Sequence, residues 1–204
     1  PRYIWIDAAA NFPDYANSKE NIAKDMEKIK AAGFTDIIVD VRPTTGDVLF
    51  NTNVVDQVKR MDVWGNSGYS YYERTETWDY LQAFIEEARI QGLKVNASIN
   101  TFVGGYLCPY NLGHDGVLFR DESKKGWASV ANLTDGLTNT MDLLDDETDY
   151  GAKFFNPAND DVQNFVLQLL ADLAKYDLDG IILDRCRYDD YGLESDFSDI
   201  SKQK

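Results

Sequence analysis

Four short apolar segments that alternate with amphipathic helical patterns constrain the fold of this 204-residue chain most strongly. The apolar segments predict β-strands over residues 3–8, 36–43, 94–102 and 179–184. Helical patterns between them run from about Ser18 to Ala32, from Trp78 to Gly92 and from Asp160 onward. Strands that alternate with helices form parallel sheets joined by right-handed crossovers. The order of the elements therefore predicts an α/β fold with a parallel sheet.

The helical segments also carry boundary and packing signals. Asn17 precedes the first helix as a candidate N-cap, Glu20 follows three residues later, and Gly33 marks the end. In the third helix, apolar residues recur from Val162 to Leu173 at the spacing of one helix face. We expect each helix to pack one apolar stripe against the sheet.

An open doubly wound sheet and a closed (β/α)8 TIM barrel both satisfy this alternation. No glycine-rich phosphate loop follows any predicted strand, which disfavours a nucleotide-binding open sheet. Long loops follow the second strand (44–76) and the third (103–156), whereas each helix returns to the next strand in two or three residues. This asymmetry is typical of barrel enzymes, which take roughly 250 residues. We expect residues 1–204 to form the N-terminal half of a single catalytic (β/α)8 TIM barrel, about four β/α units, with the rest beyond Lys204.

Composition narrows the classes of partner. The formal net charge of −15 disfavours phosphate backbones and anionic lipids, so we expect neither nucleic acid nor a membrane surface as a partner. No apolar run reaches the roughly 18 residues of a membrane span. A single histidine, His114, and two cysteines without zinc spacing predict no metal and no cofactor. We expect Cys108 and Cys186 to be free thiols, although both follow neighbouring strands and a disulfide stays open.

Polar residues occupy one side of the predicted strands near their carboxyl ends. Side chains alternate between the faces of a strand, so the apolar positions can pack on the helices while the other positions face the barrel interior. The polar set on that second face is Asp7, Asp40, Arg42, Asn100 and Asp184. Burying so many polar groups is costly, which favours a functional site. The competing interpretation is a layer of ion pairs, for example Arg42 with Asp40 or Asp7.

Four stretches together resemble a known family. The stretch VDVRPTTGDVLF (39–50) is similar to the second-strand signature of the family 10-like glycosyl hydrolases, a bacterial group of barrel proteins. YIWIDA near the start, FNPANDDV (155–162) and KYDLDGIILDRCRY (175–188) agree in order and spacing. Asp184, Arg187 and Tyr188 occupy the places of the strand-end Asp and the basic–aromatic pair. The acidic pair after Tyr188 departs from the family, where many relatives carry proline.

The resemblance implies hydrolysis of O-glycosidic bonds in a poly- or oligosaccharide by two carboxyl groups. The Asp-Gly-Ile-x-x-Asp strand end is also similar to α-amylase-type barrels, in which the fourth-strand Asp is the nucleophile. This implies Asp184 as the nucleophile, with the acid on sequence outside the chain. In other barrel glycosidases the fourth-strand carboxyl is the acid/base, which is the alternative catalytic role for Asp184. The purely structural interpretation is an inward Asp184 that forms an ion pair with Arg42 or Arg187.

The remaining expectations concern substrate contacts and setting. The predicted substrate-binding residues are Trp5, Asp7, Asp40, Arg42, Asp47, Asn100, Arg187 and Tyr188. Trp5 suits a sugar-stacking platform and plain core packing equally well. Asn156 suits helix capping as well as substrate contact, His114 is expected to be a bystander, and the acidic tail from Asp189 to Asp199 is expected to be a solvated loop. An active hydrolase and a non-catalytic carbohydrate-binding barrel both fit these residues. Either would be secreted, periplasmic or at the cell surface, and the oligomeric state stays open.

Overall fold

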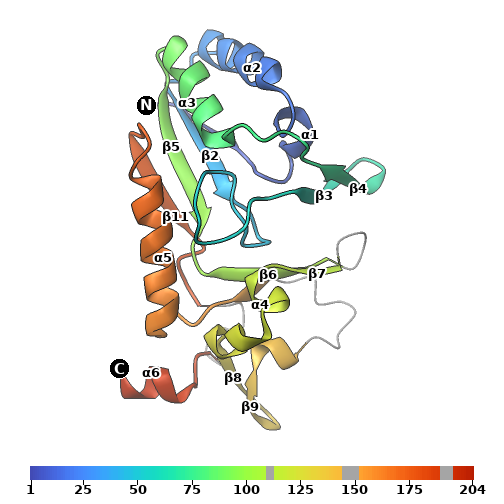
Figure 1. The fold of residues 1–204 in the computed structure, drawn as a ribbon, viewed down its shortest axis with the longest axis vertical. Helices are drawn as coiled ribbons and strands as arrows, with labels where there is room; N and C mark the ends of the chain where they lie inside the picture. The colour runs from blue at the N-terminus through green and yellow to red at the C-terminus, as the bar shows by residue number, and fades with distance from the viewer. Residues whose placement is uncertain (109–112, 144–151, 189–194) are drawn as a thin grey trace.

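The computed structural model describes residues 1–108, 113–143, 152–188 and 195–204 (Figure 1). Its centre is a four-stranded parallel sheet in the order β1-β2-β5-β11. The strands are β1 (Tyr3–Ile6), β2 (Asp36–Arg42), β5 (Lys94–Asn100) and β11 (Gly180–Asp184). All four predicted strands are therefore present, each shorter than predicted by one or two residues at its ends. The mixed α/β class is confirmed, and the described strands form an open sheet with β1 and β11 at its edges.

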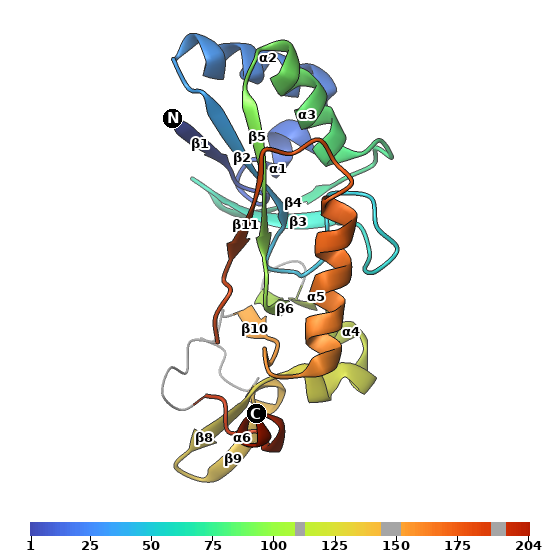
Figure 2. The ribbon, with the colours of Figure 1, turned by 90° about the vertical axis from the view of Figure 1, so that its left-hand side faces the viewer.

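Three helices cover one face of this sheet, and no helix of the described residues covers the other face (Figure 2). They are α2 (Lys19–Ala31), α3 (Tyr80–Ile90) and α5 (Asp160–Leu173). The core forms where the apolar positions of the strands meet the helices' apolar stripes. The strands contribute Ile6, Ile37, Val39, Val41, Val95, Ala97 and Ile99, all of them buried. The predicted split between a helix-facing apolar side and a second, more polar side is therefore correct for most strand positions.

The helix boundaries correct one predicted cap. Ser18, not Asn17, is the N-cap of α2, and its side chain accepts from the backbone nitrogen of Asn21. The Asn17 side chain instead donates to the carbonyl of Glu73 at 2.8 Å and accepts from the Thr75 nitrogen at 2.8 Å. Asn17 therefore fixes the segment after strand β4 (Gly68–Glu73) beside the start of α2. Both residue types cap helices well, so the sequence alone does not distinguish them.

The other two helices start at side-chain caps as well. Asp79 caps α3 by accepting from the Gln82 nitrogen, so this helix begins two residues later than predicted. Asn159 caps α5 and accepts from the nitrogens of Asp161 and Val162. These caps fix where each crossover re-enters the layer of helices above the sheet.

The long loops predicted after β2 and β5 contain regular structure. The loop after β2 forms a hairpin of β3 (Arg60–Gly65) and β4. A short helix, α1 (Phe12–Tyr15), lies earlier in the chain, between β1 and α2. The loop after β5 contains the remaining elements that precede α5. They are β6 (Val103–Cys108), β7 (Gly113–Asp115), α4 (Val117–Arg120), η1 (Glu122–Trp127), β8 (Val130–Leu133), β9 (Gly136–Asn139), η2 (Thr140–Asp142) and β10 (Ala152–Phe154).

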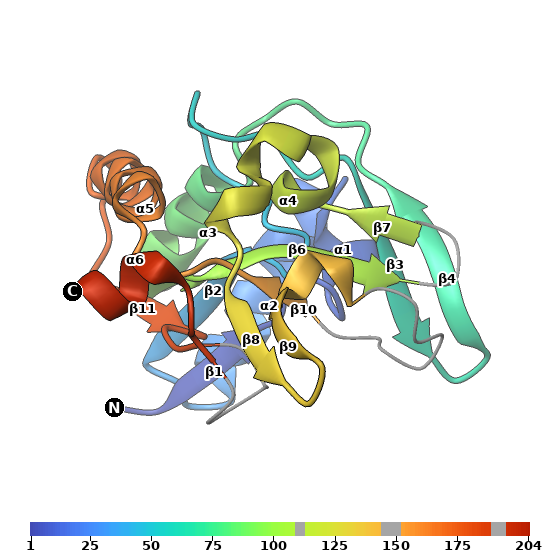
Figure 3. The same ribbon diagram turned by 90° about the horizontal axis from the view of Figure 1, so that it is seen from below.

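The elements between β5 and α5 lie below the carboxyl ends of the parallel strands, whereas the β3–β4 hairpin lies beside the sheet (Figure 1); Figure 3 shows the same elements from below. Strands β10, β6 and β7 form an antiparallel sheet, and β8 pairs with β9. A last helix, α6 (Asp199–Gln203), lies beside them. These additional elements therefore lie at the carboxyl ends of the strands, where the sequence also places its polar residues. Among the described residues, every helix is too short or too polar to cross a bilayer.

Candidate functional site

A small pocket lies at the carboxyl ends of the four parallel strands. It has a volume of about 150 Å³, and we call it the strand-end pocket. Its walls are Trp5, Asp7, Ala9, Asp40, Pro43, Thr44, Asn100, Asp184 and Arg185. Five of the nine predicted site residues are among them, one or two from each strand or the residue after it. The structure therefore brings three carboxyl groups, one amide and one indole to a single hollow.

Asp40 is the buried carboxyl of this pocket. One of its oxygens accepts from the Arg42 nitrogen at 3.2 Å, and the other faces the Asn100 amide at 3.5 Å. Burial, helped by the negative charges of Asp7 and Asp184, raises the pKa of Asp40 to about 7, against the backbone hydrogen bonds that lower it. Asp40 is consequently protonated in a large fraction of molecules at neutral pH.

Asp7 and Asp184 are exposed to solvent and held by local backbone contacts. One Asp7 oxygen accepts from the nitrogens of Ala9 at 2.8 Å and Ala10 at 2.6 Å. One Asp184 oxygen accepts from the Arg185 nitrogen at 2.8 Å, and Arg185 adopts a left-handed backbone with φ of 45°. Each side chain keeps a second oxygen for other partners. Asp7 follows the edge strand β1 and Asp184 ends the edge strand β11, which explains their exposure.

The predicted orientation of Arg42 is wrong because β2 contains an irregularity. Asp40 pairs with Ser98 of β5, whereas Arg42 pairs with Ile99, the next residue along. One residue of β2, Val41, is therefore extra, and such a bulge changes which face the following side chain occupies. Sequence alternation places Arg42 beside Asp40, but the structure places it on the side of the helices.

The Arg42 guanidinium is fully buried there. It donates to the carbonyls of Asn100 and Val103, the latter at 2.7 Å. Its central carbon lies 5.9 Å and 5.7 Å from the ring centres of Phe155 and Phe165, within cation–π range. Burial lowers the pKa of Arg42 to about 10, so it stays charged at neutral pH. Arg42 thus holds the strand end carrying Asn100 and does not line the strand-end pocket.

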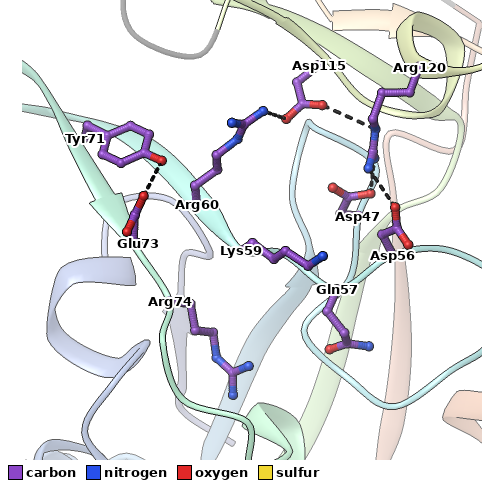
Figure 4. Close-up of a pocket in the computed structure, with 10 residues that line it drawn as sticks. All are labelled: Asp47, Asp56, Gln57, Lys59, Arg60, Tyr71, Glu73, Arg74, Asp115 and Arg120. Carbon is purple, nitrogen blue, oxygen red and sulfur yellow. Dashed lines mark hydrogen bonds and ion pairs between the residues drawn. The ribbon is translucent and has the colours of Figure 1, made fainter.

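Asp47 lies in a separate, charged pocket of about 400 Å³ (Figure 4). Arg120 pairs there with Asp47, with Asp56 at 3.0 Å and with Asp115 at 3.3 Å. Burial raises the pKa of Asp47 to about 6, against the hydrogen bond and charge of Arg120, which lower it. Asp47 therefore belongs to a cluster of three carboxylates around one guanidinium, away from Asp184.

Of the residues after β11, Arg185 lines the strand-end pocket, whereas Arg187 and Tyr188 do not. Arg187 lies over the Phe154 ring at 5.1 Å and donates to the Tyr188 carbonyl at 3.0 Å. Tyr188 is exposed, and Cys186 carries an exposed free thiol. The Cys108 side chain and residues 189–194, with most of the acidic tail, lie outside the described residues.

Asn156 and His114 both lie outside the strand-end pocket. Asn156 is buried and does not cap α5; its amide donates to Asp196 at 2.8 Å and Ser198 at 2.9 Å, which fixes the start of α6. His114 stacks on Phe119 with ring centres 4.9 Å apart, outside the strand-end pocket.

Sequence reasoning missed a second pocket beside the first, of about 320 Å³, which we call the aromatic pocket. Its walls are Asp7, Ala9, Ala10, Thr44, Thr45, Met61, Asp62, Trp64, Tyr69 and Tyr106. A signal for it is present in the sequence. Two glycines and a two-residue turn separate the aromatic residues of VWGNSGYSYY, a pattern typical of a hairpin.

Comparison with known proteins gives a fold and one sequence relative. No family model matches the chain. An S-layer-related protein of Niallia circulans is 30% identical over 210 residues, covering 98% of this chain but 12% of that protein's length. Among solved structures, the fold is similar to part of α-L-fucosidase isoenzyme 2 from Paenibacillus thiaminolyticus, with a TM-score of 0.57. That match has 20% identity and covers 90% of this chain and 23% of the fucosidase.

A second structure shares the fold along most of its own length. It is a hypothetical protein from Ruminiclostridium thermocellum, with a TM-score of 0.52 and 12% identity. The match covers 92% of this chain and 77% of that protein. The fold of the chain is thus found within a glycosidase, while it spans only a small part of the fucosidase and of the S-layer-related protein.

Proposed function

We propose that the protein is a glycoside hydrolase that cleaves O-glycosidic bonds of a poly- or oligosaccharide. The observation that carries the proposal is the convergence of Asp7, Asp40 and Asp184 on one pocket at the carboxyl ends of a parallel sheet. Barrel enzymes place their catalytic groups at these strand ends, and glycosidases need two carboxyl groups. The fold shared with part of a fucosidase and the resemblance to the family 10-like glycosyl hydrolases support the same chemistry.

The proposal includes the architecture of half a barrel. Large apolar side chains are exposed on both edge strands: Tyr3 and Trp5 on β1, and Ile181 and Leu183 on β11. Natural sheets seldom leave such edges open, and barrels remove them by closure. Residues 1–204 then form the first four β/α units, and further strands pair with β11 and β1.

Asp184 is the proposed nucleophile. Its free carboxylate oxygen attacks the anomeric carbon and forms a glycosyl ester, while an acid outside residues 1–204 protonates the leaving oxygen. Water then cleaves the ester and returns Asp184 to its carboxylate form. The alternative assignment makes Asp184 the acid/base, with the nucleophile on a strand outside residues 1–204.

The other residues of the strand-end pocket receive binding roles. Asp7, Asp40 and Asn100 offer acceptors and donors to sugar hydroxyls, and the half-exposed Trp5 offers an aromatic face. Arg42 becomes a positioning residue for Asn100. Asp47, Arg187 and Tyr188 lie outside this pocket, so any contact they make is with more distant parts of a glycan.

The proposed location is the cell surface or the medium. The support is the relative of Niallia circulans, described as S-layer-related. A glycan at the bacterial surface would then be within reach of the enzyme.

A non-catalytic carbohydrate-binding barrel is the second candidate. It is favoured by the backbone amides that already donate to one oxygen of Asp7 and one of Asp184, because carboxylates fixed in this way can bind a sugar without catalysing a reaction. Both candidates bind a glycan, and only the first consumes it.

Asp184→Asn in the full-length protein separates the two. We expect release of reducing sugar from a glycan substrate to fall by many powers of ten, because a catalytic carboxylate is worth several kcal/mol in the transition state. Binding of the same glycan should persist. Asp135→Asn, at an exposed turn, is the control and should keep full activity. Normal turnover by Asp184→Asn would refute the assignment, and a wild type that binds without hydrolysis would establish the second candidate.

A further inference from the structure

The aromatic pocket presents an exposed indole at the end of the β3–β4 hairpin. Trp64 is 67% exposed, although indole is among the most costly side chains to leave in water. It pairs across the hairpin with Tyr69, whose ring centre lies 4.9 Å away in an edge-to-face arrangement. The two-residue turn and Gly68, with φ of 98°, hold both strands close behind these rings. Trp64 is therefore held by its neighbour while one face stays open.

Another part of the pocket wall is the loop that carries Thr45. Thr45 is 4% exposed, and its Oγ1 atom has no hydrogen-bond partner within the described residues. Gly116 passes against this segment with φ of 115°, and a Cβ there would overlap the carbonyl oxygen of Thr45. The loop is thus fixed by close backbone contact.

The aromatic pocket and the strand-end pocket are neighbours. Asp7, Ala9 and Thr44 line both of them. The strand-end pocket, at about 150 Å³, is smaller than the roughly 300–1,000 Å³ of ordinary small-molecule sites, while the aromatic pocket, at about 320 Å³, falls within that range. A ligand that fills the first pocket has its natural extension in the second.

The charges of the aromatic pocket select among ligands. Its described walls carry the acids Asp7 and Asp62 and no cationic side chain. Carboxylates bind sugar hydroxyls well but repel uronic acids, sulfates and phosphates. An aromatic face with hydroxyl acceptors around it suits a neutral pyranose, whose C–H surface is apolar and whose edge is polar.

We propose that the aromatic pocket is a subsite for a second, neutral sugar unit of the glycan whose reacting unit occupies the strand-end pocket. Trp64 packs against the ring face, and the carboxyl groups of Asp7 and Asp62, which line the same pocket, accept from ring hydroxyls. The inference rests on the proposed carbohydrate function and adds to it a substrate class: a glycan of at least two neutral units, in preference to a simple monosaccharide glycoside.

The test compares oligosaccharide and monosaccharide binding by calorimetry on the full-length protein. The probes are tetrasaccharides of β-1,4-glucose, α-1,4-glucose and β-1,4-N-acetylglucosamine, their monosaccharides, and tetragalacturonate as an acidic probe. We expect at least one neutral tetrasaccharide to bind about tenfold tighter than its monosaccharide. Trp64→Ala should abolish most of that gain, and Trp64→Phe should restore part of it.

Tyr72→Ala is the matched control, since Tyr72 is an exposed aromatic residue of the same hairpin that does not line the pocket. It should keep the tetrasaccharide gain. Asp184→Asn should keep it too, so a failure of the hydrolase proposal leaves this result unchanged. The subsite is refuted if Trp64→Ala binds tetrasaccharides like the wild type, if no neutral tetrasaccharide binds, or if tetragalacturonate binds best.

Discussion

Replacing Asp40 by asparagine changes how the stability of the protein depends on pH. In the folded state burial raises the pKa of Asp40 to about 7, whereas an unfolded aspartate titrates near ~3.9. Between these two values the folded state holds a proton that the unfolded state has released. Stability therefore falls as pH rises through this window. A difference of about three pKa units corresponds to a loss of about 4 kcal/mol that is complete above the folded pKa.

The amide introduced by Asp40→Asn cannot ionise, so the variant should lose this part of the pH dependence. We expect the variant to be more stable than the wild type by several kcal/mol at about pH 8, and the advantage to shrink or vanish at about pH 4. Urea unfolding followed by tryptophan fluorescence at both pH values measures the difference. Asp47, whose pKa is also raised, contributes equally to both proteins and cancels.

Asp135→Asn is again the control, because it removes an exposed carboxyl in the turn between β8 and β9. It should shift stability by less than about 0.5 kcal/mol at either pH. If wild type and Asp40→Asn differ by the same amount at both pH values, burial does not hold a proton on Asp40. The account of the strand-end pocket as a site with one protonated acid would then be refuted.

Two further predictions concern Arg42 and the cysteines. Arg42→Leu should destabilise the protein by about 3–5 kcal/mol in urea unfolding, since it leaves the buried carbonyls of Asn100 and Val103 without a donor; a loss below ~1 kcal/mol would contradict the buried role. Thiol titration of the denatured, non-reduced protein should find both Cys108 and Cys186 free, and finding neither would overturn this expectation.

The sheet and its helices follow from the sequence because their signals are local and repeated. Each strand is a run of apolar residues, and each helix carries an apolar stripe after a capping residue. In a parallel sheet all carboxyl ends meet at one edge, so the order of elements alone brings Asp7, Asp40 and Asp184 together. That step needs no knowledge of side-chain packing.

The position of Arg42 depends on packing that the sequence does not display. Strict alternation places it on the polar side with Asp40, but the bulge at Val41 moves it to the opposite side. The guanidinium then meets Phe155 and Phe165, which are more than a hundred residues further along the chain. A bulge is decided by such long-range contacts, and alternation arguments fail at that residue.

The three carboxyl groups of the strand-end pocket differ because of their places in the sheet. Asp7 and Asp184 follow or end the edge strands β1 and β11, where solvent reaches the side chains. Asp40 is on β2, between β1 and β5, so strand neighbours on both sides exclude water from its carboxyl group. The charges of the two edge acids then add to the burial that favours its protonated form. Sheet order, more than residue type, thus separates one proton-holding acid from two exposed ones, and environments that differ in this way allow acid and base roles within one site.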